Sequence, residues 1–201
     1  MSLISRLFNR SEREISLTTA VAAYEAGQYE IAVSHLTKLA EMGNPTAQNN
    51  LAHMYNQGLG VAQDDNKAFL LYQQAADSGL NDAYMGLGYA YETGRGVNQN
   101  IDKAISCYLL VAEQGNVDVE NNLGGLYREK GEYEEAVRWL ERAAMRGDPK
   151  AQFNLGNCYG LGQGVTESRD TAVFWLTEAA KQGHAAAFEL LKRISNSSVQ
   201  K

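Results

Sequence analysis

Cysteine and proline are scarce in this 201-residue chain, which contains two of each alongside nineteen glycines. Cys107 and Cys158 stand at non-equivalent places in the internal repeat, so we expect two free, partly buried thiols instead of a disulfide framework. With so little proline and 44% hydrophobic residues, the composition favours helices over a sandwich of short strands. A chain of this length can bury a core without a metal or disulfide staple.

Long apolar runs are also missing. No stretch approaches the roughly 18 apolar residues of a membrane-spanning helix. Residues 1–15 include Arg6 and Arg10 and lack the apolar segment and cleavage site of a secretory signal, which predicts a cytoplasmic protein. We interpret residues 1–15 as a leader or a cap over the first repeat. An amphipathic helix that contacts a membrane surface through residues 1–10 is the alternative.

Excess positive charge is absent as well. The formal net charge is −6, and lysine and arginine are dispersed along the chain instead of clustered. A phosphate backbone would therefore be repelled overall, which disfavours nucleic-acid binding.

An internal repeat is the strongest feature that is present. Three blocks of 36 residues, 45–80, 81–116 and 149–184, carry one pattern at fixed offsets. A fourth block, 117–148, is shorter because its glycine loop contracts to Lys130-Gly131, and residues 27–44 align with 131–148 without a gap. We predict five helix pairs and a closing helix, with the bounds 16–44, 45–80, 81–116, 117–148, 149–184 and 185–195, followed by a disordered tail at 196–201.

Each block predicts two helices, helix A and helix B, joined by a loop. In block 81–116, Gly88 stands on the apolar face of helix A, where it lets helix B approach closely. The loop Gly94-Arg95-Gly96-Val97 follows, because glycine adopts a positive φ at little cost and ends helix A. Gly115 ends helix B in the same manner. Each pair completes its core only by stacking on its neighbours.

The repeated signature is Ala, Leu-Gly, Tyr, Gly-x-Gly-Val, Lys-Ala, an aromatic residue and Ala-Ala-x-x-Gly. In block 81–116 it comprises Ala83, Leu87, Gly88, Tyr91, Gly94, Gly96, Val97, Lys103, Ala104 and Tyr108. This pattern resembles the Sel-1-like repeat over roughly residues 16–194, whereas units 117–148 and 16–44 look more like the shorter tetratricopeptide repeat.

The resemblance implies an all-α fold, a right-handed α-α superhelix (solenoid), whose helices A line a concave groove that docks proteins or peptides. Some secreted bacterial members carry a disulfide in each repeat. This chain lacks those cysteines, which argues against an extracytoplasmic location and agrees with a cytoplasmic bacterial protein.

If helix A faces the groove, the side chains offset from Leu-Gly and Tyr point into it. That projection gives a predicted protein-binding set of amides, aromatic residues and a few charged groups: Tyr24, Asn49, His53, Asn56, Met85, Tyr89, Glu92, Asn121, Arg128, Phe153 and Asn157. Such side chains suit hydrogen bonds to an extended peptide backbone, with the aromatic residues as anchors. Packing between adjacent helices is the alternative for each, above all for Met85 and Phe153.

Signatures of catalysis are not found. His35, His53 and His184 fall in different units, so no metal site and no cofactor are expected. The glycine loops follow helices and no Walker-type lysine follows them, so they are connections. The sequence thus predicts a non-enzymatic scaffold or adaptor that binds another protein or peptide. The alternatives are an immunity or inhibitor protein that neutralises a toxin or enzyme and, last, a hydrolase or β-lactam-binding enzyme.

Overall fold

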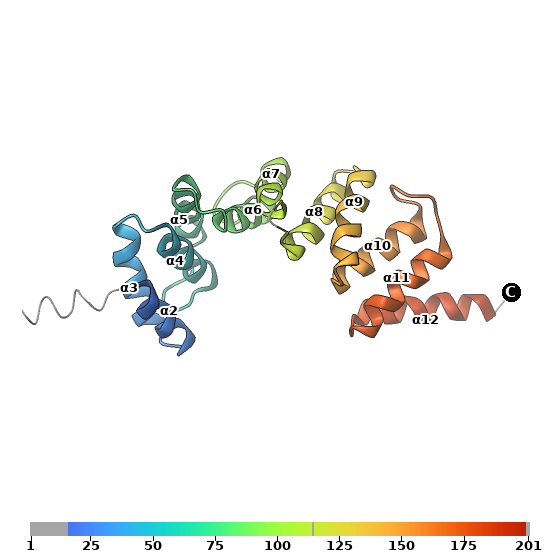
Figure 1. Cartoon of the computed structure of the whole chain (residues 1–201), viewed down its shortest axis with the longest axis horizontal. Coiled ribbons are helices and arrows are strands. Elements are labelled where there is room, and N and C mark those ends of the chain that lie inside the picture. Colours follow the sequence, from blue (N-terminus) through green and yellow to red (C-terminus); the bar gives the residue numbers. More distant parts are fainter. Residues whose placement is uncertain (1–15, 114, 200–201) are drawn as a thin grey trace, which may run out of the picture. The chain divides into compact units, whose positions relative to one another are not determined.

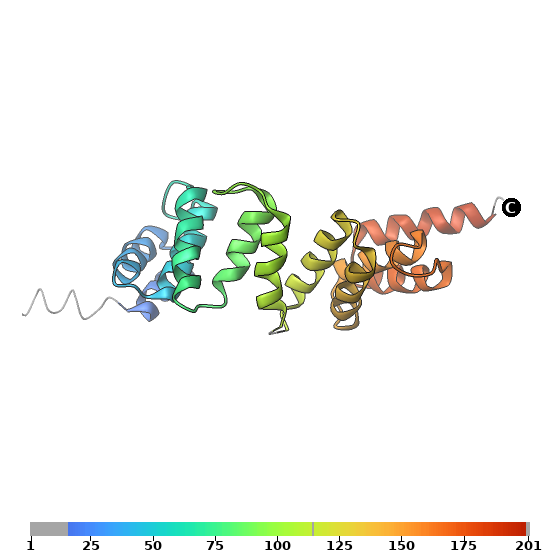
Figure 2. The ribbon, with the colours of Figure 1, turned by 90° about the horizontal axis from the view of Figure 1, so that it is seen from above.

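The chain forms consecutive antiparallel helix pairs (Figures 1 and 2). A computed structural model describes residues 16–113 and 115–199, and within these ranges it contains eleven helices and no strand. The helices are α2 (Leu17–Glu25), α3 (Tyr29–Glu41), α4 (Pro45–Gln57), α5 (Asp65–Asp77), α6 (Ala83–Thr93), α7 (Ile101–Ala112), α8 (Val117–Glu129), α9 (Tyr133–Met145), α10 (Pro149–Leu161), α11 (Arg169–Lys181) and α12 (Ala185–Val199). The predicted all-α fold of stacked helix pairs is confirmed.

Contacts divide the chain into two units. The first ends at Cys107 and contains α2 to α6 with the start of α7, and the second begins at Tyr108 and contains the end of α7 with α8 to α12. Within each unit, successive helices pack on one another along the chain: α3 on α4 and α4 on α5 in the first, α9 on α10 and α10 on α11 in the second.

The C-terminus differs from the prediction. Helix α12 runs from Ala185 to Val199, four residues beyond the expected end at 195. Residues 196–199 contain neither glycine nor proline, so nothing in the sequence stops the helix there. The predicted leader or cap at 1–15 and the membrane contact through 1–10 lie outside the described residues, as do residues 200 and 201.

Helix starts follow local capping chemistry. The side chains of Asn44 and Asp148 accept hydrogen bonds from the N–H groups of Ala47 and Ala151, at 2.9 and 2.6 Å. A proline follows each cap at the first helical position, where its missing N–H costs nothing. Equivalent repeats therefore begin in register.

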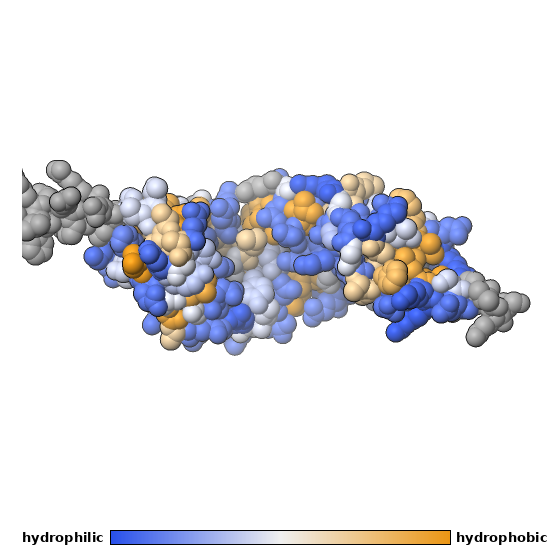
Figure 3. Space-filling view, turned by 90° about the horizontal axis from the view of Figure 1, so that it is seen from below, coloured by the Kyte–Doolittle hydropathy of each residue, from blue (hydrophilic) through white to orange (hydrophobic). Residues whose placement is uncertain are grey.

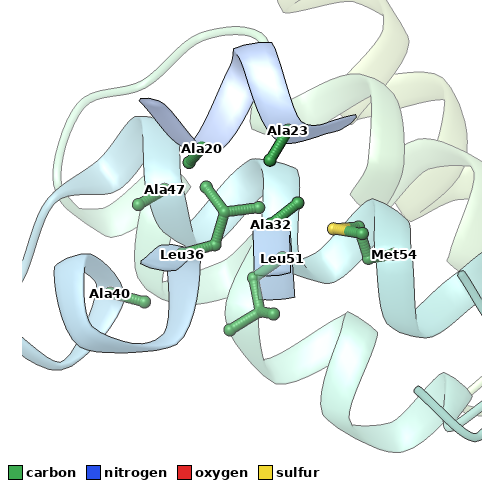
Figure 4. Close-up of a cluster of buried hydrophobic side chains, with 8 residues drawn as sticks. All are labelled: Ala20, Ala23, Ala32, Leu36, Ala40, Ala47, Leu51 and Met54. Carbon is green, nitrogen blue, oxygen red and sulfur yellow. The ribbon is translucent and has the colours of Figure 1, made fainter. Parts of the chain in front are cut away.

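Small side chains let the helices of the first unit approach closely. Its core contains Ala20, Ala23, Ala32, Leu36, Ala40, Ala47, Leu51 and Met54, which converge from α2, α3 and α4 (Figure 4). Only three of these eight are larger than alanine, so the interhelical distance depends on the alanines, and larger substitutions there would overpack the core.

Glycine on helix A serves the same purpose. A Cβ added to Gly124 would lie 2.5 Å from the Cγ atom of Leu140, and one on Gly156 would lie 2.9 Å from that of Leu176. Both glycines align with Gly88, which is itself buried. The close approach predicted for Gly88 is thus observed at its counterparts.

The second glycine of each loop joins one repeat to the one before it. Gly60, Gly96 and Gly164 each have φ of 68 to 72° and press against the first residue of the preceding helix B. Their neighbours there are the main chains of Tyr29, Asp65 and Tyr133, and a Cβ at any of the three would overlap with that backbone. The positive φ expected from the sequence is one reason for glycine here, and this steric requirement is a second.

Candidate functional site

The exposed face of helices A in the first unit carries the predicted aromatic residues. Tyr24 on α2, Met85 and Tyr89 on α6 are exposed large side chains, and His53 on α4 is exposed as well. The structure brings Tyr24 and His53 together, with ring centroids 6.5 Å apart in an edge-on arrangement. Met85, at 46%, is the most exposed of the three large side chains.

Hydrophobic and hydrophilic residues are intermixed on the face that the space-filling view shows (Figure 3). Exposed apolar side chains outside helices A include Met42 at the end of α3 and Met145 at the end of α9. Exposed hydrophobic area alone consequently does not single out the helix A face.

Three predicted residues of the first unit are less accessible. Asn49 and Glu92 are half-buried. Asn56 is only 8% exposed, and its side chain donates to Asp65 Oδ1 at 3.4 Å and accepts from Gln57 at 3.0 Å. Asn56 is thus a buried structural residue, since its polar groups are occupied inside the protein, and its side chain is withdrawn from the predicted groove.

Arg95, which sequence analysis treated only as a loop residue, organises this region. Its Nε and NH2 donate to the two carboxylate oxygens of Asp65 at 3.0 and 2.8 Å, and NH2 also donates to the Asn56 carbonyl at 3.0 Å. NH1 lies 3.4 Å from the Tyr89 hydroxyl. The loop of repeat 81–116 is therefore tied to both helices of repeat 45–80, and Tyr89 is held beside the junction. Leu59 and Gln163 occupy the equivalent place in the other two Gly-x-Gly loops, so a comparison of these loops could have shown Arg95 as the one charged residue at this place.

This pair gives stability that depends on pH. Hydrogen bonds from Arg95 lower the pKa of Asp65 below its ordinary value of 3.8. We expect Arg95→Met to reduce the free energy of unfolding by about 1 kcal/mol at neutral pH, because a bidentate pair at a partly exposed site is worth little more. A depressed carboxyl pKa stabilises the fold above the unfolded value, and this contribution disappears as the pH falls through the folded pKa, below 3.8. Urea unfolding of both proteins from neutral to acid pH measures it.

The matched control is Asp65→Asn. In that background Arg95→Met should change stability by a few tenths of a kcal/mol at most, at every pH, because the ionised partner is gone. If Arg95→Met lowers stability as much in the Asp65→Asn background as in the parent protein, Arg95 stabilises the fold through its other contacts.

In the second unit, the predicted residues make internal contacts. The side-chain amide of Asn154 donates to Asn121 Oδ1 at 3.0 Å. Phe153 stacks on His184 with centroids 4.6 Å apart and packs against the core around Leu176, which is the alternative considered for it. Arg128 NH2 lies 3.5 Å from Gln163 Oε1, and its buried Nε has no hydrogen-bond partner. Asn157 is half-buried.

Nucleophile chemistry finds little support among the described residues. Cys107 and Cys158 are free and buried, and burial raises the pKa of both thiols, which keeps them protonated at neutral pH. Within residues 16–113 and 115–199, no cluster of three or more His, Cys, Asp or Glu side chains could hold a metal. In the same ranges, no helix has the length and apolarity needed to cross a bilayer.

Three helix pairs of the fold form repeats of 36 residues. In each of these pairs a Gly-x-Gly loop connects the two helices and packs against the preceding repeat, which is typical of one class of α-helical repeat proteins. The Sel1 repeat family model matches residues 45–80, 81–116 and 149–184, and a tetratricopeptide repeat model matches residues 121–152. The chain belongs to the Sel1 repeat family, with one tetratricopeptide-like repeat between its Sel1 repeats.

Individual relatives agree with this assignment. A crystal structure of a Sel1 repeat protein from Oxalobacter formigenes is 34% identical, with a TM-score of 0.76 over 88% of this chain and 74% of that one. The immunity protein Pa5087 from Pseudomonas aeruginosa is 26% identical, with a TM-score of 0.50 over 84% and 67%. An exopolysaccharide production negative regulator of Rhizobium leguminosarum bv. viciae is 30% identical over 86% of this chain and 58% of its own length. The chain thus spans somewhat more than half of that regulator.

Proposed function

We propose that this protein is a non-enzymatic scaffold or adaptor of the bacterial cytoplasm that binds a peptide or protein surface through the exposed side chains of its helices A. The observation that carries the proposal is the set Tyr24, His53, Met85 and Tyr89, which the first unit leaves outside its core. Aromatic side chains contribute large contact areas at little entropic cost and dominate protein interfaces. Membership of the Sel1 repeat family supports the same conclusion.

In the second unit, Asn121, Asn157 and Arg128 supply polar groups on helices A. Arg128 is the single cation of the predicted set, which suits a carbonyl or carboxylate of a partner. The binding surface of this unit is proposed to be more polar than that of the first.

Removal of the aromatic anchors tests the proposal. Tyr24→Ala combined with Tyr89→Ala should weaken binding of a captured partner about tenfold or more, because each anchor contributes upwards of about 1 kcal/mol. Affinity capture from a lysate of the source organism, followed by titration of the captured protein, measures the loss. The melting temperature should fall only slightly, because each side chain is more than a third exposed and neither belongs to the buried core.

Met42→Ala combined with Met145→Ala is the matched control, since it removes exposed apolar area away from helices A. This control should retain the partner. If the captured partner binds the tyrosine variant as tightly as the parent protein, the proposed binding surface is contradicted.

A more specific role is suggested by two likenesses. The similarity to an immunity protein favours a chain that neutralises a toxin or enzyme, and the net charge of −6 suits a basic target. The similarity to a regulator favours control of another protein through binding. Tight one-to-one binding that abolishes the activity of the captured partner would support inhibition, whereas a partner that stays active would support scaffolding.

A further inference from the structure

A hollow of about 570 Å³ opens in the first unit between α3 and α5. Leu51, Leu70 and Leu71 form apolar parts of its wall, and Glu41 and Lys67 contribute opposite charges. No residue that lines it belongs to the helix A surface proposed above. The hollow is therefore a separate candidate site.

One buried polar atom on its wall lacks a partner. Gln48 is only 7% exposed, and its amide nitrogen donates to the Ala40 carbonyl at 3.4 Å. Its Oε1 is buried and accepts no hydrogen bond. Such an acceptor is costly to leave unsatisfied, and a donor that reaches it would be bound correspondingly well.

The equivalent atom of the last Sel1 repeat is satisfied from within the chain. Gln152 occupies the place of Gln48, and Gln182 Nε2 donates to its Oε1 at 2.9 Å and to the Gly147 carbonyl at 3.0 Å. Gln182 stands directly before the glycine that ends helix B. A single carboxamide thus serves two acceptors there.

The short repeat shows the same arrangement with charged groups. Glu120 takes the place of Gln48. Arg142 NH2 lies 2.9 Å from its carboxylate, and Arg146, again directly before the terminal glycine, lies 3.4 Å from it. Arg146 also donates to the carbonyl of Gly115 at 2.6 Å. Two repeats of the second unit therefore supply this donor themselves.

Repeat 45–80 does not do so. Gln74, which aligns with Arg142, gives Gln48 Oε1 no hydrogen bond, and the position before the terminal glycine is Ser78. Its short hydroxyl donates to the Gln74 carbonyl at 2.9 Å instead. Seven residues earlier, Leu71 stands where the second unit has Trp139 and Trp175. Two smaller side chains explain both the hollow and the unpaired oxygen.

We propose that this hollow binds a glutamine side chain of a partner peptide, whose carboxamide donates to Gln48 Oε1 while an adjacent large apolar side chain packs on Leu51 and Leu70. The carboxamide reproduces the contacts of Gln182, with its second N–H directed to the carbonyl of Gly43, the counterpart of Gly147. The apolar neighbour occupies space that tryptophan fills in the second unit. A carboxylate has no proton to donate at neutral pH and is rejected.

The probe is acetyl-Trp-Gln-Leu-N-methylamide, titrated into the ¹⁵N-labelled full-length protein. Saturable shifts of backbone amides around residues 37–51 and 67–78 are expected. The glutamate isostere should bind at least about tenfold more weakly, because it leaves the buried acceptor unpaired. Equal binding of the two peptides, or shifts that never saturate at these residues, would overturn the proposal.

Two variants complete the test. Ser78→Gln should block the probe and raise the melting temperature by about 2–4 °C, because the chain then supplies its own donor. Gln48→Leu should lower probe affinity at least about tenfold. Unchanged probe affinity in both variants would overturn the site. The Tyr24→Ala, Tyr89→Ala protein should bind the probe like the parent, so failure here is distinguishable from failure of the helix A surface.

Discussion

Gly164→Ala is expected to lower the free energy of unfolding of the second unit by about 2–4 kcal/mol. Two costs combine: φ is 72°, where a Cβ is strained, and the new methyl group would overlap with the main chain of Tyr133. Backbone cannot rotate away as a flexible side chain can, so the repeats must separate. Urea unfolding followed by circular dichroism measures the loss.

Gly131→Ala separates the two costs. Its φ of 78° is similar, but no atom lies within 4 Å of the added Cβ. This variant should lose only about 1 kcal/mol, the cost of a positive φ for alanine. Similar losses in the two variants would mean that the contact between loop and preceding helix does not contribute.

Arg142→Met combined with Arg146→Met should cost about 3–5 kcal/mol, because it leaves the carboxylate of Glu120 buried without a counter-charge. Glu120 is 0% exposed, and its nearest cationic atoms are Arg142 NH2 at 2.9 Å and Arg146 NH1 at 3.4 Å. Both arginines are themselves about half exposed, so their own desolvation contributes little to the balance. Thermal or urea unfolding at neutral pH reports the difference.

Addition of Glu120→Gln to that double variant should restore most of the loss, because a neutral amide is far less costly to bury than an unpaired carboxylate. If the triple variant is as unstable as the double variant, the arginines act through packing, for example that of Arg142 on the Trp139 ring at 4.5 Å.

The repeat pattern predicted the fold because helix A, loop and helix B each have their own local signal. Glycines at fixed offsets predicted the loops, and Gly94 does end α6 with a φ of 75°. The predicted end of the last helix was wrong. The end of a helix is recognised in a sequence from helix-breaking residues, and residues 196–199 contain none.

The candidate site was less predictable, because helical periodicity assigns a face but no partner. It assigned Tyr89 and Asn56 to one surface. Tyr89 is exposed, whereas Asn56 is only 8% exposed, because Asp65 and Arg95 hold that residue in a junction between repeats. Contacts between residues 30 or more apart, such as Arg95 with Asp65, leave no periodic signal. Differences among the aligned repeats do give a signal. Arg95, Ser78 and Leu71 each differ from their counterparts in other repeats, and each lies at a distinctive feature of the structure.

The loop glycines have a consequence for how such a chain can change. Gly60, Gly96 and Gly164 meet main-chain atoms, not side chains, of the preceding helix B. A contact between main-chain atoms does not depend on the identity of nearby exposed side chains. Mutations can therefore change the outer faces of a block while the contact of its loop with the preceding block is preserved. A 36-residue block that keeps both loop glycines and the buried side chains that pack on its neighbours can therefore change its exposed faces and still dock on the preceding block.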